Sequence, residues 1–158
     1  MFADPKAPEQ PVVANKCAKD EGYTEFNGNC FVVKELPAGK QSWTEAQKVC
    51  KNIGDRYGDL ATVSDSYENA LFHHLLSEHW RMGRGNNSHH AWINMKEHFG
   101  HFAWENTCPV VFSNFQDLNI KPTTTSCVGL GRDGKWQSVD CDTPIRFAVC
   151  QRRYSKPR

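Results

Sequence analysis

The sequence lacks any strong imbalance of charge and any long apolar run. Its 19 lysine and arginine residues stand against 18 aspartate and glutamate residues, which leaves a formal net charge of +1. Such a chain has no overall field that would attract nucleic acid or an acidic membrane surface. No segment has the length and apolarity of a transmembrane helix, so we predict neither nucleic-acid binding nor membrane insertion.

Motifs of common catalytic centres are also missing. We find no nucleophile elbow, HExxH motif, P-loop or paired-carboxylate signature, and we predict that the protein is not an enzyme and carries no cofactor. The seven histidines include no i,i+4 pair on a predicted helix and no acidic partner at metal-binding spacing. Solvated surface histidines are therefore favoured over a bound metal.

The first 16 residues contain no apolar core of the kind that a signal peptide needs. A secreted protein that begins with this segment is expected to be a mature form. The segment is rich in proline, alanine and charge, so we expect residues 1–16 to form a flexible lead-in.

Cysteine, by contrast, is abundant, with seven in the chain. None lies within four residues of another, whereas structural zinc sites are usually built from closely spaced pairs. Spread cysteines in a small domain indicate disulfides and an oxidising compartment, so we predict a secreted, extracellular protein. Spacing alone does not select the pairing, and one cysteine is left over.

Two capping boxes mark two predicted helices in the first half of the chain. Ser42 and Glu45 frame the first helix, and Asp65 and Glu68 frame the second. Apolar residues at helical spacing predict the buried faces of the two helices, which are formed by Trp43, Ala46, Cys50 and Ile53 and by Tyr67, Leu71, Leu75 and Trp80, respectively.

Strand patterns dominate the rest of the sequence. Asn27-Gly28, between two short β-like runs, is a strong hairpin signal. From Ala91 onward the runs AWINM, HFAW, CVGL, KWQSV and RFAVC are separated by turns. The stretch from Thr107 to Ser126 has no periodicity, and long irregular segments inside compact domains are often functional. Early helices followed by late antiparallel strands predict a single α+β domain.

An ordered series of motifs in this chain resembles the C-type lectin-like domain. The series runs CFVV, SWTEAQKVC, LATVSDSYENALF, AWINM, FAWENTCPVVFSNF, CVGLGRDGKWQSVDC and FAVC. We assign residues 17–151 to this domain and residues 152–158 to a basic tail. The chain is most similar to the long form of the domain, which carries an extra N-terminal hairpin, as in secreted invertebrate lectin-like proteins.

The resemblance implies a disulfide-stabilised fold in which two helices flank antiparallel sheets and a long loop region carries the ligand site. It also implies three disulfides, which are Cys17–Cys30, Cys50–Cys150 and Cys127–Cys141. In such a fold four tryptophans are expected to be core anchors rather than platforms for sugar rings, namely Trp43, Trp92, Trp104 and Trp136.

Sugar-binding members of the family hold a calcium ion through a Glu-Pro-Asn or Gln-Pro-Asp tripeptide in the long loop. Calcium takes about six to eight oxygen ligands, several of them carboxylates. Aligned on its proline, the tripeptide of this chain is Lys121-Pro122-Thr123. Aligned by distance from Phe115, it is Asn119-Ile120-Lys121. The acidic ligand is absent in both alignments.

The family's remaining ligand positions are also altered. Ser126 occupies the place of an acidic residue before the next cysteine, and Gln137 and Ser138 replace an Asn-Asp pair after the tryptophan. Lys121 would repel a cation, and Asp117 is the remaining acid of the loop. We therefore predict no calcium at this site and no other bound metal.

The absence of these ligands leaves two functions open. The first is a secreted recognition domain that binds an extracellular protein or glycan without calcium at the principal site. The second is a carbohydrate-binding lectin that uses atypical ligands, or basic residues that contact sulfated glycans. The loop tripeptide favours the first, because a lectin-like fold does not by itself imply sugar binding.

Two further positions bear on assembly and processing. Cys108 is left over after the implied disulfides, so it forms either an intermolecular bond, giving a homodimer, or a free thiol. It lies in a polar turn that we expect to be exposed, and we predict that some of the protein is a disulfide-linked dimer. Asn86 begins an Asn-Asn-Ser sequon in a predicted loop and is a candidate N-glycosylation site.

Overall fold

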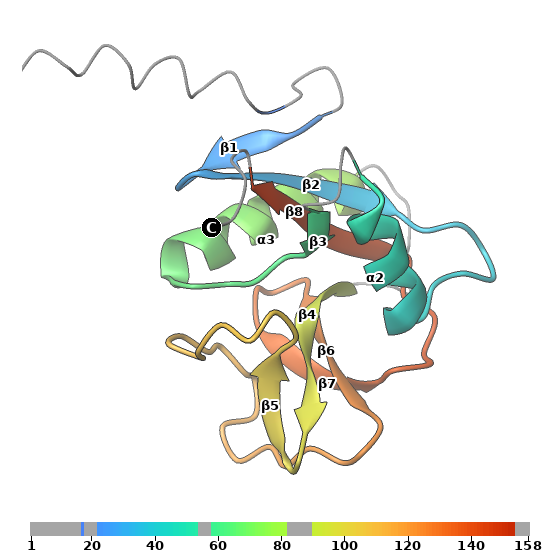
Figure 1. Cartoon of the computed structure of the whole chain (residues 1–158), viewed down its shortest axis with the longest axis vertical. Coiled ribbons are helices and arrows are strands. Elements are labelled where there is room, and N and C mark those ends of the chain that lie inside the picture. Colours follow the sequence, from blue (N-terminus) through green and yellow to red (C-terminus); the bar gives the residue numbers. More distant parts are fainter. Residues whose placement is uncertain (1–16, 18–21, 54–57, 82–89, 154–158) are drawn as a thin grey trace, which may run out of the picture.

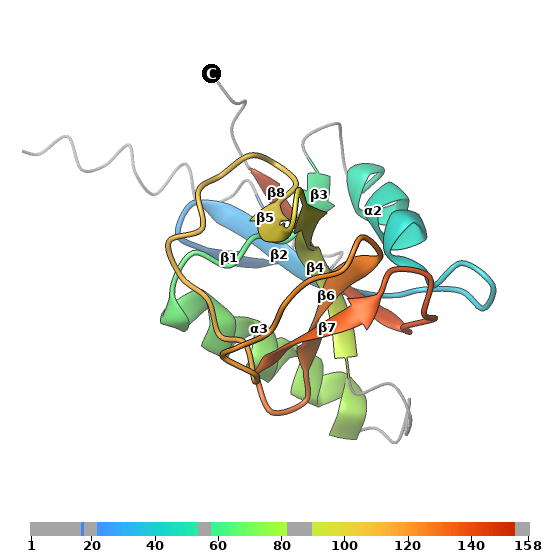
Figure 2. The same cartoon turned by 90° about the horizontal axis from the view of Figure 1, so that it is seen from below.

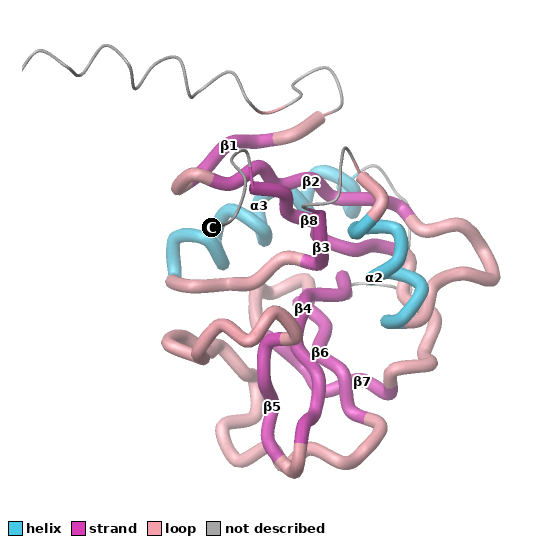
Figure 3. Tube along the Cα trace, in the orientation of Figure 1, coloured by secondary structure: helices cyan, strands magenta, loops and turns pink. Residues whose placement is uncertain are grey.

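In the computed structural model, which describes residues 17, 22–53, 58–81 and 90–153, two helices flank a central sheet. Figures 1 and 2 show helices α2 (Trp43–Lys51) and α3 (Ser66–Arg81) on opposite sides of the part of the sheet that contains the first two strands and the last strand of the chain. Figure 3 shows that a second group of strands and long loops lies beyond them. The predicted α+β layout is confirmed.

Eight strands form one sheet in the order β1-β2-β8-β4-β6-β7, with β3 beside β8 and β5 beside β4. Their bounds are β1 (Thr24–Phe26), β2 (Asn29–Glu35), β3 (Gly58–Leu60), β4 (His90–His98), β5 (His101–Trp104), β6 (Ser126–Gly131), β7 (Trp136–Asp140) and β8 (Phe147–Arg153).

One strand pair departs from the predicted antiparallel arrangement. β4 and β8 run parallel, with Ala91 opposite Phe147 and Trp92 opposite Ala148. A parallel pair needs a long crossover connection, and here the crossover contains β5, the long loop and the β6–β7 hairpin. No local turn signal reports such a pairing, so the sheet is mixed where the sequence predicts antiparallel strands.

The predicted hairpin and the first predicted helix are confirmed. Asn27 and Gly28, with φ angles of 52° and 81°, form the turn between β1 and β2. The Ser42 side chain accepts the Glu45 N–H at 3.3 Å and caps α2. The face predicted to be buried, made of Trp43, Ala46, Cys50 and Ile53, is buried in the core.

Helix α3 starts where its capping box predicts but buries a different face. The Asp65 carboxylate accepts the Glu68 N–H at 2.8 Å. Tyr67, which we predicted to be buried, is 73% exposed, and Leu71 and Leu75 are only half-buried. The side chain of Trp80 lies outside the described part of the structure. The buried positions of α3 are instead Glu68, Asn69, Phe72 and Leu76.

The structure contains three disulfides, and they join the same pairs that the family resemblance implies. They are Cys17–Cys30, Cys50–Cys150 and Cys127–Cys141. The second ties α2 to β8 across a sequence separation of 100 residues. The four tryptophans expected in the core are each at most 3% exposed. Within the described ranges, none of the helices combines the length and apolarity needed to span a membrane.

Candidate functional site

The irregular segment 107–125, here called the long loop, is docked on β7 through backbone hydrogen bonds. The Trp136 N–H donates to the Asn114 carbonyl, and the Gln116 N–H donates to the Trp136 carbonyl, each at 2.9 Å. Phe115 forms an isolated bridge with Trp136 between these two bonds. The middle of the long loop is therefore fixed against the sheet, as Figure 2 shows for the strand–loop contact near β7.

Aromatic side chains of the long loop pack against the Trp136 ring. The Trp136 ring contacts the rings of Phe112, Phe115 and Trp104, with centroid separations of 5.9, 5.4 and 5.5 Å. Aromatic pairs at such distances add stabilisation beyond the area that they bury. Other apolar residues of the loop point outward, since Val111 is 72% and Leu118 is 88% exposed.

Trp136 is also fixed by a buried polar contact with helix α3. Its indole Nε1–H donates to the Asn69 Oδ1 at 2.7 Å. The Asn69 amide in turn donates to the Gly134 carbonyl at 2.9 Å, which also accepts from Asn114 Nδ2 at 2.8 Å. Asn69 thus fixes the tryptophan and the β6–β7 turn, and the long loop is joined to the same Gly134 carbonyl through Asn114.

Gln137, at a position where the family places a calcium ligand, has both ends of its amide engaged. Its Oε1 accepts from the His90 Nε2 at 2.8 Å, and its Nε2 donates to the Gln116 Oε1 at 2.6 Å. Ser138 pairs with Val128 in the β6–β7 ladder. The structure therefore has a neutral hydrogen-bonded chain, His90–Gln137–Gln116, where calcium-binding relatives need oxygen ligands directed at an ion.

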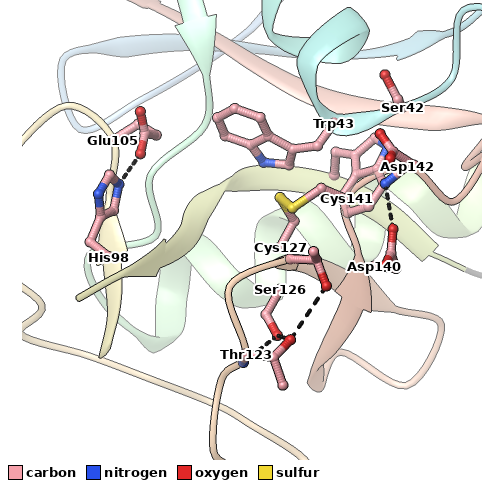
Figure 4. The surroundings of a disulfide bond; sticks show 12 residues. Ser42, Trp43, His98, Glu105, Thr123, Ser126, Cys127, Asp140, Cys141 and Asp142 are labelled. Carbon is pink, nitrogen blue, oxygen red and sulfur yellow. Dashed lines mark hydrogen bonds and ion pairs between the residues drawn. A yellow bond between two sulfur atoms is a disulfide. The ribbon is translucent and has the colours of Figure 1, made fainter. Parts of the chain in front are cut away.

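The other candidate calcium positions do not converge on Gln137. Thr123 and Ser126 form a separate hydroxyl cluster, in which the Ser126 Oγ accepts the Thr123 N–H at 2.9 Å (Figure 4). Asn119 and Lys121 are exposed and Pro122 is half-buried. The Asp117 Oδ1 accepts the Asn119 N–H at 3.0 Å, which closes a local turn.

Two more acidic residues lie beside the Cys127–Cys141 disulfide. The Asp142 N–H donates to the Asp140 Oδ1 at 2.9 Å, and both carboxylates are exposed (Figure 4). On the β4–β5 side of the same view, His98 pairs with Glu105. Across the described ranges, no group of three or more His, Cys, Asp or Glu side chains is placed to hold a metal ion.

Cys108, the leftover cysteine, is half-buried rather than fully exposed as the sequence predicts, and it is free within the described structure. Its N–H donates to the Asn106 Oδ1 at 3.1 Å, and its side chain packs against the core. It lines a polar cavity of about 140 Å³ with Thr62, Glu68 and Gln151. Burial raises the pKa of the Glu68 carboxyl. The turn is compact because Asn106 Nδ2 also donates to the Thr62 Oγ1, at 2.7 Å.

Sequence reasoning did not identify another, shallower cavity, which Gln137 helps to line. This cavity measures about 310 Å³ and is lined by His90, Arg132, Asp133 and Gln137. Its residues come from β4, the β6–β7 turn and β7, so no single motif contains them. The signal that the sequence does carry is the spacing of Gly129 and Gly131 on β6. The candidate glycosylation site Asn86 lies outside the described residues.

Comparison with protein families places this architecture among known domains. A family model described as the lectin C-type domain matches residues 39–152. Human FRAS1-related extracellular matrix protein 1 is 28% identical over 137 residues, which cover 84% of this chain. The chain spans 6% of the length of that relative.

Solved structures share the fold at low sequence identity. Human lithostathine is 21% identical with a TM-score of 0.67, and the match covers 84% of this chain and 98% of that chain. SPL-2 from Saxidomus purpuratus, titled a Ca²⁺-independent C-type lectin, is 20% identical with a TM-score of 0.69. That match covers 90% of this chain and 97% of SPL-2.

Proposed function

The chain belongs to the C-type lectin domain family, and we propose that it is a secreted, non-enzymatic recognition domain that binds an extracellular protein or glycan without calcium at the family's principal site. The family model covers residues 39–152, which is most of the chain. The fold presents a long loop that is fixed at its centre and has apolar side chains directed outward, an arrangement suited to recognition.

The state of the Gln137 amide carries this proposal. A calcium ligand at this position would direct its oxygen at the ion, but the Gln137 oxygen accepts from His90 and the amide nitrogen donates to Gln116. Recruiting Gln137 to an ion would break the bond from His90, and no carboxylate would join it from Ser138. Calcium binding there would thus lose existing contacts and gain too few charged ligands.

Two observations support an extracellular location. Three disulfides stabilise the described structure, and such bonds persist in oxidising compartments. The human relative is named as an extracellular matrix protein. We also propose that residues 17–151 form the recognition domain, that Asn86 carries a glycan, and that Cys108 links two chains in a fraction of the molecules.

The effect of calcium on stability and binding tests the proposed function. We expect millimolar calcium to leave the midpoint of thermal unfolding unchanged, whereas an ion present at 100 times its dissociation constant would add about 2.7 kcal/mol. Binding to glycan arrays and to extracellular matrix proteins is measured in parallel, in calcium and in EDTA. Binding that is lost in EDTA and restored by calcium contradicts the proposal.

Carbohydrate binding is a second candidate function, and the cavity beside Gln137 favours it. SPL-2 is titled a Ca²⁺-independent lectin, so sugar recognition without the ion exists on this fold. Here the cavity is lined by charged groups of both signs, Arg132 and Asp133, beside the Gln137 amide.

A further inference from the structure

The cavity next to Gln137 combines both signs of charge in a small space. Arg132 and Asp133, both exposed, lie in the turn between β6 and β7, and His90 and Gln137 complete the lining. We propose that this cavity is a calcium-independent binding site for one neutral sugar ring of a glycan. This inference rests on the proposed function and names the ligand class and the residues that would bind it.

The backbone of the turn that carries Arg132 and Asp133 is held in place by several hydrogen bonds. The β6–β7 turn is closed by the Gly134 N–H, which donates to the Gly131 carbonyl at 2.9 Å, and it is linked to α3 by His73, whose Nε2 contacts the Arg132 carbonyl at 2.6 Å. The Asp133 Oδ1 accepts the Lys135 N–H at 3.0 Å. Because this backbone is already ordered, the entropy lost on binding is mainly that of the Arg132 and Asp133 side chains.

Two glycines on β6 avoid crowding the turn and the residues that line the cavity. Gly129 and Gly131 are two residues apart and so face the same side of the strand. A Cβ on Gly129 would lie 3.4 Å from the His90 Cβ. One on Gly131 would lie 3.1 Å from the Lys135 carbonyl oxygen, 3.2 Å from the Asp133 Oδ1 and 3.6 Å from the Gln137 Nε2. Neither glycine has a positive φ, so space rather than backbone conformation explains them.

Free donors and acceptors remain on the lining. The Arg132 guanidinium forms no hydrogen bond or ion pair with the described part of the chain, and Asp133 uses one carboxylate oxygen for the turn. The guanidinium can donate to a hydroxyl oxygen, and the second oxygen of Asp133 can accept from a hydroxyl group. Charge-assisted bonds of this kind are about twice as strong as neutral ones.

The pair of opposite charges selects a neutral ligand. A sulfated or carboxylated sugar would meet the Asp133 carboxylate, and an amine would meet the Arg132 guanidinium. Adjacent hydroxyl groups satisfy both, since each hydroxyl donates and accepts. A volume of about 310 Å³ lies at the lower end of the range for ligand pockets, so it suits one ring rather than an oligosaccharide. Affinity for a single ring is expected to be on the order of millimolar.

The test is a nuclear magnetic resonance titration of the isotope-labelled full chain in EDTA. The probes are methyl glycosides of mannose, galactose and N-acetylglucosamine, with a sulfated galactoside as the anionic arm. We expect at least one neutral glycoside to shift the amide signals of His90 and of residues 131–137. Arg132→Ala should weaken its binding about tenfold or more, and Asp133→Asn should weaken it severalfold.

Lys135→Ala is the matched control, because this exposed cation lies in the same turn but does not line the cavity. It should bind like the wild type, and the thermal midpoints of all three variants confirm that they fold. The inference is overturned if no neutral glycoside shifts these signals, if Arg132→Ala and Asp133→Asn bind like the wild type, or if the sulfated probe binds more tightly. Each of these results in EDTA leaves the proposed function standing, whereas binding that requires calcium overturns the proposed function itself.

Discussion

Asn69 links helix α3 to Trp136 and to the β6–β7 turn through one side chain. It is 7% exposed, it accepts from the Trp136 indole and it donates to the Gly134 carbonyl. An asparagine in the first turn of a helix is not identified as a core residue by an apolar pattern, because its side chain is polar. Its burial is explained by two satisfied hydrogen bonds.

Replacing this asparagine tests that role. We expect Asn69→Ala to lower the free energy of unfolding by about 2 kcal/mol or more, because the buried indole N–H of Trp136 loses its acceptor. Asn114→Ala, which removes the half-buried donor to the same Gly134 carbonyl, should cost about 1 kcal/mol or less. Urea unfolding followed by tryptophan fluorescence measures both. Equal losses in the two variants would show that the Trp136 contact is not the dominant one.

Cys108 supports a second prediction at the level of one residue. Its thiol is half-buried, whereas Val111, three residues further on, is 72% exposed. A local opening of the turn would therefore be enough to expose the thiol to a second chain. We expect a fraction of the oxidised protein to run as a dimer on a non-reducing gel, and Cys108→Ser to run only as a monomer.

A disulfide between two copies needs Cα atoms about 4.4–6.8 Å apart, which is a strict condition for a half-buried residue. Labelling with a thiol reagent under native conditions therefore accompanies the gel. If the wild type is entirely monomeric and Cys108 reacts readily, the thiol is free and the dimer prediction is wrong.

At the scale of elements, the N-terminus of α3 carries a buried acid. Glu68 is 4% exposed, and its carboxylate accepts the Ser64 N–H at 2.8 Å. Burial raises its pKa above the ordinary value of 4.5. The folded state therefore holds this proton more tightly than the unfolded state does. The stability contributed by this group is fully present below the ordinary pKa and is lost as the pH rises through the raised pKa.

Glu68→Gln should therefore change how stability depends on pH. Glutamine keeps an acceptor for the Ser64 N–H but does not titrate. We expect the free energy of unfolding of the variant, relative to that of the wild type, to be higher at about pH 7 than at about pH 4. Asp59→Asn in β3 should act in the same direction, because burial also raises the pKa of Asp59. Urea unfolding at both pH values measures the difference, and a constant difference contradicts the prediction.

Local signals predicted the elements better than their pairing. The Ser42 and Asp65 caps and the Asn27-Gly28 turn act within a few residues, so the sequence displays them directly. The prediction of the buried face of α3 was wrong because Phe72 and Leu76 share that face with the polar residues Glu68 and Asn69. The parallel β4–β8 pair was missed because its two strands are joined only through a distant crossover.

The candidate site was harder to predict for the same reason. The missing calcium ligands could be read at fixed motif positions, but the contact of His90 with Gln137 joins residues 47 apart in sequence. Arg132 and Asp133 read as an ordinary turn. Only the sheet order, with β4 beside β6 and β6 beside β7, brings these residues to one cavity.

At the scale of the whole molecule, the disulfides differ in the length of chain that they close. Cys50–Cys150 has a sequence separation of 100 and Cys17–Cys30 one of 13. In the chain-entropy model, closing the 100-residue segment with Cys50–Cys150 stabilises the fold by about 4–5 kcal/mol, and closing the 13-residue segment with Cys17–Cys30 does so by about 3 kcal/mol. We therefore expect the double alanine variant of Cys50 and Cys150 to lose more stability than that of Cys17 and Cys30.

Chemical unfolding of the two double variants under oxidising conditions gives the comparison. Each variant leaves the other two disulfides in place, so the difference reports the cross-link that was removed. A larger loss on removal of Cys17–Cys30 would mean that local packing of the hairpin, rather than chain entropy, sets its contribution.

Two disulfides also connect the two ends of the domain by a short covalent path. β1 and the end of β8 both pair with β2, with Thr24 opposite Phe31 and Arg153 opposite Asn29, and Figure 1 shows them at one end of the molecule. Tension applied between Cys17 and Cys150 passes through Cys17–Cys30, along the backbone to Cys50, and across to Cys150. The load bypasses residues 51–149, so a pull on the two ends cannot stretch the backbone of the long loop or of the strands beside the cavity. Even with β2 and α2 torn out, the ends separate by only about 70 Å, since an extended chain spans about 3.3–3.6 Å per residue.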